Sequence, residues 1–284
     1  MARKINSKLL ERLISGDLLP LLNFVKNDKD LRLEVRQNEK AFIYYRKGKA
    51  LEIGLKTFSV DEKYVKNTIL TIPDTNLAKS KPADYFKQMK KIIDNYVDNI
   101  KNRSEFDTQQ KIASNNQEKN DKYIIIDMEY AFPQSNLEKS KRLKRAGFDL
   151  LGLERTTGKV IFFEVKKGIG ALEGDAGIKS HIKDFELYLF GESKEDFREI
   201  LKKDIENIIS DKNELGLIEY SLPDNYEIND NNIDFIFVYE PDESDVVGSI
   251  NEYKKIFNQE TEKLDSKKNY NSLFVSKANR YKLS

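Results

Sequence analysis

The sequence contains no cysteine and a single histidine. The absence of cysteine excludes disulfide bonds, zinc sites built from thiolates, and cysteine nucleophiles. One histidine excludes metal sites built from several imidazoles. No apolar run approaches the length of a membrane-spanning helix, and the first residues lead into a charged amphipathic segment instead of a signal peptide. These absences predict a soluble protein, and we expect it in the cytoplasm.

An excess of charge of one sign is also missing. The 49 Lys and Arg residues nearly balance the 48 Asp and Glu residues, which leaves a net charge of +1. A phosphate-binding surface would therefore have to come from local segregation of charge. This balance counts modestly against a nucleic-acid-binding function.

The chain has 284 residues, enough for a large core with an added lobe. Apolar residues at helical spacing up to Lys26, with Pro20 starting a second helix, precede three short strands with turns at Asn38-Glu39 and Lys47-Gly48. We therefore predict an N-terminal α+β lobe over residues 1–78. Its basic and aromatic residues could contact nucleic acid, although a sheet face with a solvated turn is the preferred interpretation. These residues are Tyr44, Tyr45, Arg46, Lys47 and Lys49.

The remaining residues, 79–284, form the second predicted domain, in which helices and strands alternate. Its predicted helices are Tyr85–Ile100, Glu105–Asn116, a helix starting near Gly177, Phe197–Ile209 and Ile250–Leu264. Its predicted strands are Tyr123–Ala131, Phe148–Glu154, Lys159–Val165, Asn232–Tyr239 and Ser272–Ser276.

The two strands around residue 156 form a predicted β-hairpin that brings acidic residues together at its open end. If Arg155 pairs with Gly158 across a Thr156-Thr157 turn, the numbers of paired residues sum to 313, which places Asp149 opposite Glu164. Because side chains alternate along a strand, Glu164 and Lys166 then share a face with Asp149. A slip of one residue would send Asp149 to the other face.

Two neighbouring carboxylates repel each other, and a hard divalent cation relieves that conflict. Mg²⁺ is commonly held by one or two carboxylates while it keeps waters and phosphate oxygens. A neighbouring ammonium can orient the attacking water or stabilise charge on a phosphate. The set Asp149, Glu164 and Lys166 is therefore suited to phosphodiester hydrolysis. The alternative is that all three are solvated residues at strand ends.

The pattern of Asp149 followed by Glu164-Val165-Lys166 across an apolar hairpin resembles the PD-(D/E)XK, or restriction-endonuclease-like, nuclease superfamily. The resemblance covers about residues 103–241, although the proline of the family motif is absent before Asp149. It implies an α/β fold with a core of helix, three strands, helix and strand. It also implies that Asp149 and Glu164 hold Mg²⁺, for which Mn²⁺ should substitute, while Lys166 assists the attacking water.

The resemblance also implies a further acid from the helix before the first core strand. Glu105 is the candidate for this third metal ligand, with Gln109 one turn along the same face. The alternative for Glu105 is a carboxylate stabilised by the helix dipole. Glu129, which is expected to share a strand face with Asp127, is the reserve candidate.

Several basic residues near the predicted site are candidates for contact with a phosphate backbone. They are Lys141, Arg142, Lys144 and Arg145 before Asp149, and Lys179 and Lys183 on the helix after the hairpin. His181 lies between the last two. A role as a ligand or proton shuttle is considered for it, but a surface or hydrogen-bonded core histidine is the preferred interpretation.

The leading hypothesis is a Mg²⁺-dependent deoxyribonuclease in which Asp149, Glu164, Lys166 and Glu105 are catalytic. The pattern is similar to stand-alone bacterial nucleases of phage defence and mobile elements. The alternative is a catalytically inactive nuclease-like module that binds nucleic acid or a partner protein. RNA as the substrate, and a homo-oligomer or protein partner, stay open at this stage.

Overall fold

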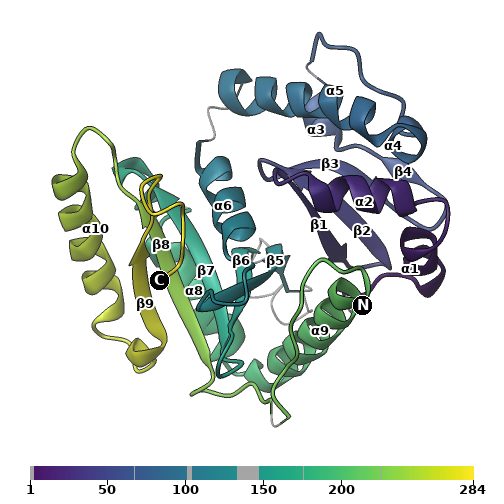
Figure 1. Cartoon of the computed structure of the whole chain (residues 1–284). Helices are drawn as coiled ribbons and strands as arrows, with labels where there is room; N and C mark the ends of the chain where they lie inside the picture. The colour runs from purple at the N-terminus through teal and green to yellow at the C-terminus, as the bar shows by residue number, and fades with distance from the viewer. Residues whose placement is uncertain (1–2, 67, 101–103, 133–146, 175, 225) are drawn as a thin grey trace. The chain divides into compact units, whose positions relative to one another are not determined.

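A computed structural model describes residues 3–66, 68–100, 104–132, 147–174, 176–224 and 226–284 (Figure 1). The fold is mixed α/β and contains two sheets. Residues 1–114 with 204–221 form one compact unit, here unit 1, and residues 115–203 with 222–284 form unit 2.

Unit 1 combines an antiparallel sheet, in the order β1-β2-β3-β4, with helices that cover it. Its strands are β1 (Leu31–Arg36), β2 (Lys40–Tyr45), β3 (Gly48–Ile53) and β4 (Phe58–Ser59). Its helices are α1 (Ser7–Ile14), α2 (Leu19–Asn27), α3 (Glu62–Val65), α4 (Leu77–Ser80), α5 (Pro82–Asp94), the π-helix η1 (Asn95–Ile100) and α6 (Ser104–Asn115). Helix α9 (Lys194–Glu214) begins in unit 2 and ends in unit 1.

Local sequence signals explain where these elements start and turn. The side chain of Asn6 caps α1 by accepting a hydrogen bond from the Lys8 N–H at 3.0 Å, and Pro20 lies in the first turn of α2, as predicted. The second hairpin turn is at Arg46-Lys47, so its predicted position at Lys47-Gly48 was wrong by one residue. Gly48 instead starts β3, where a Cβ atom would lie 2.8 Å from the side chain of Ile93. Glycine is needed there for close packing against α5.

The boundary predicted at residue 78 falls inside α4, within unit 1. Helix α4 packs against α2 and α5, and α5 packs on β3. Residues on both sides of position 78 thus contribute to the same core.

A buried ion cluster links the sheet of unit 1 to the end of α9. The side chain of Glu34 is fully buried, and its two oxygens accept hydrogen bonds from different cations: Lys212 Nζ at 2.5 Å and Arg32 Nε at 2.8 Å. Burial alone would raise the pKa of Glu34, but Lys212, Arg32 and Arg36 lower it to about 2. The carboxylate is therefore charged, and each of its oxygens has a cationic partner.

Unit 2 is built on a five-stranded sheet in the order β5-β6-β7-β8-β9, with helices α8 and α10. Its strands are β5 (Tyr123–Ala131), β6 (Gly147–Glu154), β7 (Val160–Lys167), β8 (Ile233–Glu240) and β9 (Tyr270–Phe274). Its other elements are η2 (Ile169–Ala171), α8 (Ile178–Leu189), α10 (Val246–Thr261) and η3 (Lys267–Asn269). Strand β6 runs antiparallel to both of its neighbours, β5 and β7, whereas β7, β8 and β9 are parallel to one another. Strand β7 is central in the sheet.

The predicted register of the β6-β7 hairpin is confirmed for the four pairs between residues 150–153 and 160–163. Leu150 pairs with Phe163, Leu151 with Phe162 and Leu153 with Val160, so each pair sums to 313. The backbone pairing between β6 and β7 ends at Leu150, so it does not include the predicted pair of Asp149 and Glu164.

Aromatic packing fixes α8 and α10 on one face of this sheet. Phe162 of β7 packs against Phe185 of α8 with ring centroids 5.8 Å apart, and Phe185 stacks on Phe235 of β8 at 4.8 Å. Tyr253 of α10 stacks on Tyr239 of β8 at 4.7 Å. This core holds α8 firmly over the face of β7 that carries Phe162. In the described parts of the chain, no helix combines the length and apolar character required to cross a membrane.

Candidate active site

The candidate site lies at the end of β7, the central strand of unit 2. Glu164 and Lys166 alternate with Phe162 along β7, so all three side chains belong to the face that α8 covers. Lys166 Nζ lies 2.6 Å from Glu164 Oε1, and the two side chains are each 3% exposed. Lys167 pairs separately with Glu240 at 3.2 Å. The predicted acid and ammonium thus form a buried contact.

A third side chain joins this pair from α8. His181 Nε2 lies 2.9 Å from the same oxygen, Glu164 Oε1, and the His181 side chain is 17% exposed. The preferred interpretation of the sequence placed His181 outside the site. The helical spacing gave a signal that His181 faces the core, because it is one turn from Ile178 and from Phe185, which are both buried.

The charge of Glu164 is stabilised although the residue is buried. Burial raises its pKa, but attraction to Lys166 and, when the imidazole is protonated, to His181 outweighs this effect and lowers the pKa to about 2. Both donors use Oε1. The other oxygen, Oε2, is buried and has no hydrogen-bond partner among the residues that the structure describes.

Asp149 lies beside this group, but its orientation differs from that of a regular strand residue. Its Oδ2 accepts a hydrogen bond from the Val165 N–H at 2.9 Å, and the residue is 8% exposed. The Phe148 ring packs on Phe162 at 4.6 Å, whereas Leu150 pairs with Phe163, which points to the opposite face. The alternation of β6 therefore breaks at Asp149, and its carboxylate turns to the backbone of β7.

The neighbouring strand is irregular at the same level. Glu129 falls between two residues of β5 that pair with Leu150 and Phe148, and its φ of 56° is in the left-handed region. Asp127 is fully buried whereas Glu129 is exposed. The expectation that they share a strand face depended on regular alternation, which the left-handed conformation of Glu129 interrupts.

The other predicted site residues are distributed as follows. Lys179 and Lys183 are exposed on α8. Glu105 and Gln109 lie on α6 in unit 1, and the role of Glu105 stays a prediction. The remaining candidate phosphate contacts, which are Lys141, Arg142, Lys144 and Arg145, lie outside the described residues.

A divalent cation at this site would require oxygen ligands that are not already engaged. A buried carboxylate oxygen normally has a partner, and Glu164 Oε2 offers a lone hard oxygen of the kind that Mg²⁺ prefers. No group of three or more His, Asp or Glu side chains suited to one ion occurs in the described ranges. Glu164 therefore offers one oxygen suited to a divalent cation, and Asp149 is the neighbouring acid.

After Lys167 the chain leaves the site through a tight turn. Gly168 has a φ of 72°, and a Cβ atom there would lie 2.5 Å from Asp242 Oδ1. Asp242 Oδ2 accepts a hydrogen bond from the Ile169 N–H at 3.0 Å. The turn thus requires glycine for two separate reasons.

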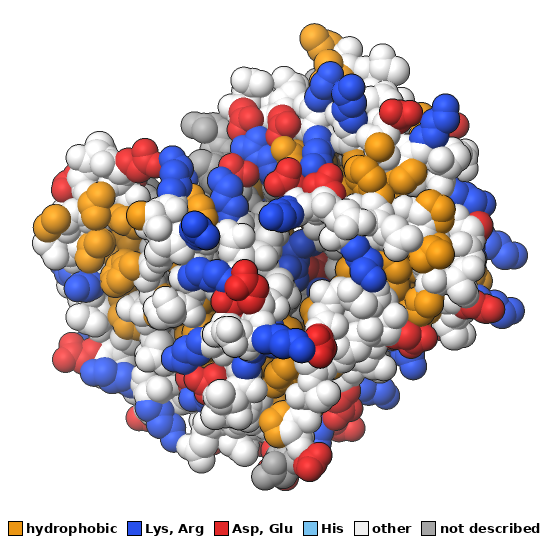
Figure 2. All heavy atoms as spheres, viewed as in Figure 1, with side chains coloured by type: hydrophobic (Ala, Val, Ile, Leu, Met, Phe, Trp, Pro, Cys, Tyr) orange, Lys and Arg blue, Asp and Glu red, His pale blue; other side chains and the backbone are white. Residues whose placement is uncertain are grey.

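The basic residues of the N-terminal sheet are engaged within unit 1. The Arg46 guanidinium contacts Asp94, Asp98 and Asp107 at 2.9, 2.7 and 2.7 Å, and Lys49 pairs with Glu52 at 2.7 Å. On the face shown in Figure 2, basic side chains are interspersed with acidic ones. These contacts favour a structural role for the sheet residues.

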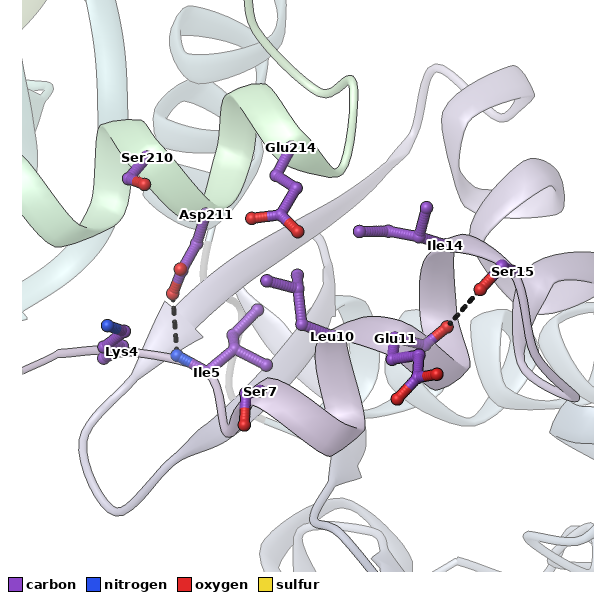
Figure 3. Close-up of a pocket in the computed structure, with 10 residues that line it drawn as sticks. All are labelled: Lys4, Ile5, Ser7, Leu10, Glu11, Ile14, Ser15, Ser210, Asp211 and Glu214. Atoms are coloured by element: carbon purple, nitrogen blue, oxygen red, sulfur yellow. Dashed lines mark hydrogen bonds between the residues drawn. The ribbon is translucent and has the colours of Figure 1, made fainter.

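A pocket of about 370 Å³ in unit 1 is separate from the candidate active site (Figure 3). It lies between the N-terminal segment, α1 and the last turns of α9. Asp211 spans it by accepting a hydrogen bond from the Ile5 N–H at 2.7 Å, and burial raises the pKa of its carboxyl group. The pocket contains none of the predicted site residues.

In comparisons with known proteins, no family model, curated protein or solved structure matches this chain.

Proposed function

We propose that this protein is a Mg²⁺-dependent nuclease that hydrolyses phosphodiester bonds in DNA, with Mn²⁺ able to substitute. The observation that carries the proposal is the state of Glu164. This buried, charged residue has one carboxylate oxygen without a hydrogen-bond partner among the described residues. A buried charge is costly unless it is fully matched. A cation at Oε2 would supply the missing partner of the Glu164 carboxylate.

The order of elements supports the same proposal. Among the elements of the described residues, α6 is followed by β5, β6 and β7, then by α8 and α9, and then by β8. The nuclease resemblance implies a helix, three strands, a helix and a strand, with the acids on the second and third strands. Asp149 is on β6 and Glu164 is on β7.

Each residue then has a definite task. Asp149 and Glu164 would hold the cation. When bound, Mg²⁺ would polarise a phosphoryl oxygen and lower the pKa of a bound water. Lys166 would hold Glu164 in the charged form and orient the attacking water, and Lys179 and Lys183 would contact the backbone of the nucleic acid.

The test is cleavage of circular, linear and single-stranded DNA, and of RNA, with Mg²⁺ or Mn²⁺. Glu164→Gln and Asp149→Asn should each reduce cleavage by about 100-fold or more, as expected when a group that stabilises the transition state is removed. Asp234→Asn is the matched control. Asp234 is a buried carboxylate at the start of β8, paired with Lys159 at 2.7 Å, and its variant should cleave like the wild type.

The outcome also separates the alternatives. Wild-type protein that binds DNA or a protein partner, but cleaves no substrate with either metal ion, would favour an inactive nuclease-like module. Cleavage of RNA alone would change the substrate class while keeping the site. A role in phage defence or mobile-element biology is part of the proposal and rests on the resemblance alone.

A further inference from the structure

We infer that His181 is a positioning residue that presents Glu164 Oε2 to the metal ion. This inference rests on the proposed function, because it assumes that a divalent cation binds at Glu164. It assigns a task to the residue of the candidate site that the sequence interpretation left out.

The contacts of Glu164 are distributed unequally between its two oxygens. Lys166 Nζ lies 2.6 Å from Oε1, and His181 Nε2 lies 2.9 Å from the same atom. Oε2 is buried without a hydrogen-bond partner in the described ranges. Because both donors contact Oε1, Oε2 is the oxygen that can serve as a ligand to a hard cation.

The two donors differ in their mechanical properties. A lysine ammonium sits on a flexible four-carbon chain and can swing from one carboxylate oxygen to the other. An imidazole has only two side-chain torsions. The backbone of His181 is fixed by α8, where Ile182 and Phe185 are buried and Phe185 packs on Phe162. His181 therefore determines which oxygen carries the donors.

The contact does not depend on protonation of the ring. A neutral imidazole with its hydrogen on Nε2 donates to Glu164 as a protonated one does. Nδ1 of His181 is buried and has no hydrogen-bond partner among the described residues, so Glu164 supplies the polar contact recorded for this ring. Loss of the Nε2 donor should free Lys166 to occupy Oε2 and compete with the cation.

The test is a titration of the full chain with Mn²⁺. The concentration of free Mn²⁺ is measured by electron paramagnetic resonance. His181→Leu removes the donor and should weaken Mn²⁺ binding about 10- to 100-fold, the range found for residues that orient metal ligands. His181→Gln keeps an N–H donor at similar reach and should stay within about threefold of the wild type. In cleavage assays, His181→Leu should need more Mn²⁺ for half-maximal rate but approach the wild-type rate at saturation.

Two controls make the result decisive. Lys203→Leu alters an exposed residue of α9 in unit 2 that has no part in the proposed site, and it should leave Mn²⁺ affinity unchanged. If His181→Leu does not fold, as judged by its thermal transition, His181→Met replaces it. Equal Mn²⁺ affinity of wild type, His181→Leu and His181→Gln, together with loss of binding in Glu164→Gln, would overturn this inference alone. Failure of the wild type to bind Mn²⁺ would instead overturn the proposed function.

Discussion

At the scale of single residues, two buried glutamates differ in how their carboxylate oxygens are paired. Glu34 is fully buried and uses both oxygens, one for Arg32 and one for Lys212. Glu164 is equally buried, but both of its recorded donors reach one oxygen. Two glutamates at similar depth therefore differ in whether both carboxylate oxygens have a cationic partner, and this difference underlies the role proposed for Glu164.

Removal of a partner of Glu34 should destabilise the fold. Lys212→Met leaves a buried carboxylate without one of its cations, and we expect the free energy of unfolding to fall by about 3–5 kcal/mol. Urea denaturation monitored by circular dichroism measures the change.

The matched control is Lys255→Met, because Lys255 pairs with Glu252 on the surface at 3.2 Å. A change within about 0.5 kcal/mol is expected there. A loss below about 1 kcal/mol in Lys212→Met would show that the buried contact contributes little.

The sequence predicted single-residue contacts correctly where the alternation of side chains along a strand brought an acid and an amine to the same face. The hairpin spacing placed Glu164 and Lys166 on one face of β7, and the structure brings them into contact. His181 was set aside because one histidine on a mixed helix carries little information by itself. Its partner is 17 residues away in sequence, and no local pattern reports such a contact.

At the scale of elements, strand positions followed from residue pattern, but irregularities did not. The predicted bounds of β5, Tyr123–Ala131, agree with the structure, and the β6-β7 register is as predicted. The break in alternation at Glu129 and Asp149 was not foreseen, because a left-handed residue in a strand has no sequence signature unless it is glycine. That break turns Asp149 to the backbone of β7.

The first hairpin of unit 1 offers an element-scale prediction. Asn38 and Glu39 have φ values of 62° and 60°, and Glu39 is exposed. Glycine adopts this conformation without strain, so Glu39→Gly should raise the free energy of unfolding by about 0.5–1 kcal/mol. Urea denaturation provides the measurement.

Lys87→Gly is the control, because Lys87 is exposed in the middle of α5. It should lower the free energy of unfolding by about 1 kcal/mol. A loss of stability in both variants would mean that the contact of Glu39 with Asn6, at 2.8 Å, outweighs the backbone strain.

At the scale of the whole molecule, unit 1 is completed by a distant stretch of the chain. Residues 204–221 supply Lys212 for Glu34, and the carboxylates of Asp204 and Asp211 accept the N–H groups of Arg3 and Ile5 at 2.7 Å. A linear reading of the sequence assigns this stretch to the second domain. Such a return of the chain cannot be inferred from local pattern, since its partners are more than 170 residues away.

This arrangement predicts the behaviour of fragments. Residues 1–114 alone should show no cooperative thermal transition by circular dichroism, because Glu34 would be buried without Lys212. Addition of a peptide of residues 204–221 should restore a transition, and the same peptide with Lys212→Met should restore it less. A fully cooperative transition of the fragment alone would contradict the prediction.

The exit from β7 limits how the acidic hairpin can be reused in protein engineering. The chain turns at Gly168 against Asp242, which belongs to the segment after β8. A transplanted hairpin that ended at Lys167 would lack this anchor, and its last charged side chains would be free to reorient. A graft into another scaffold would therefore have to carry the aspartate-bound glycine turn together with the two strands.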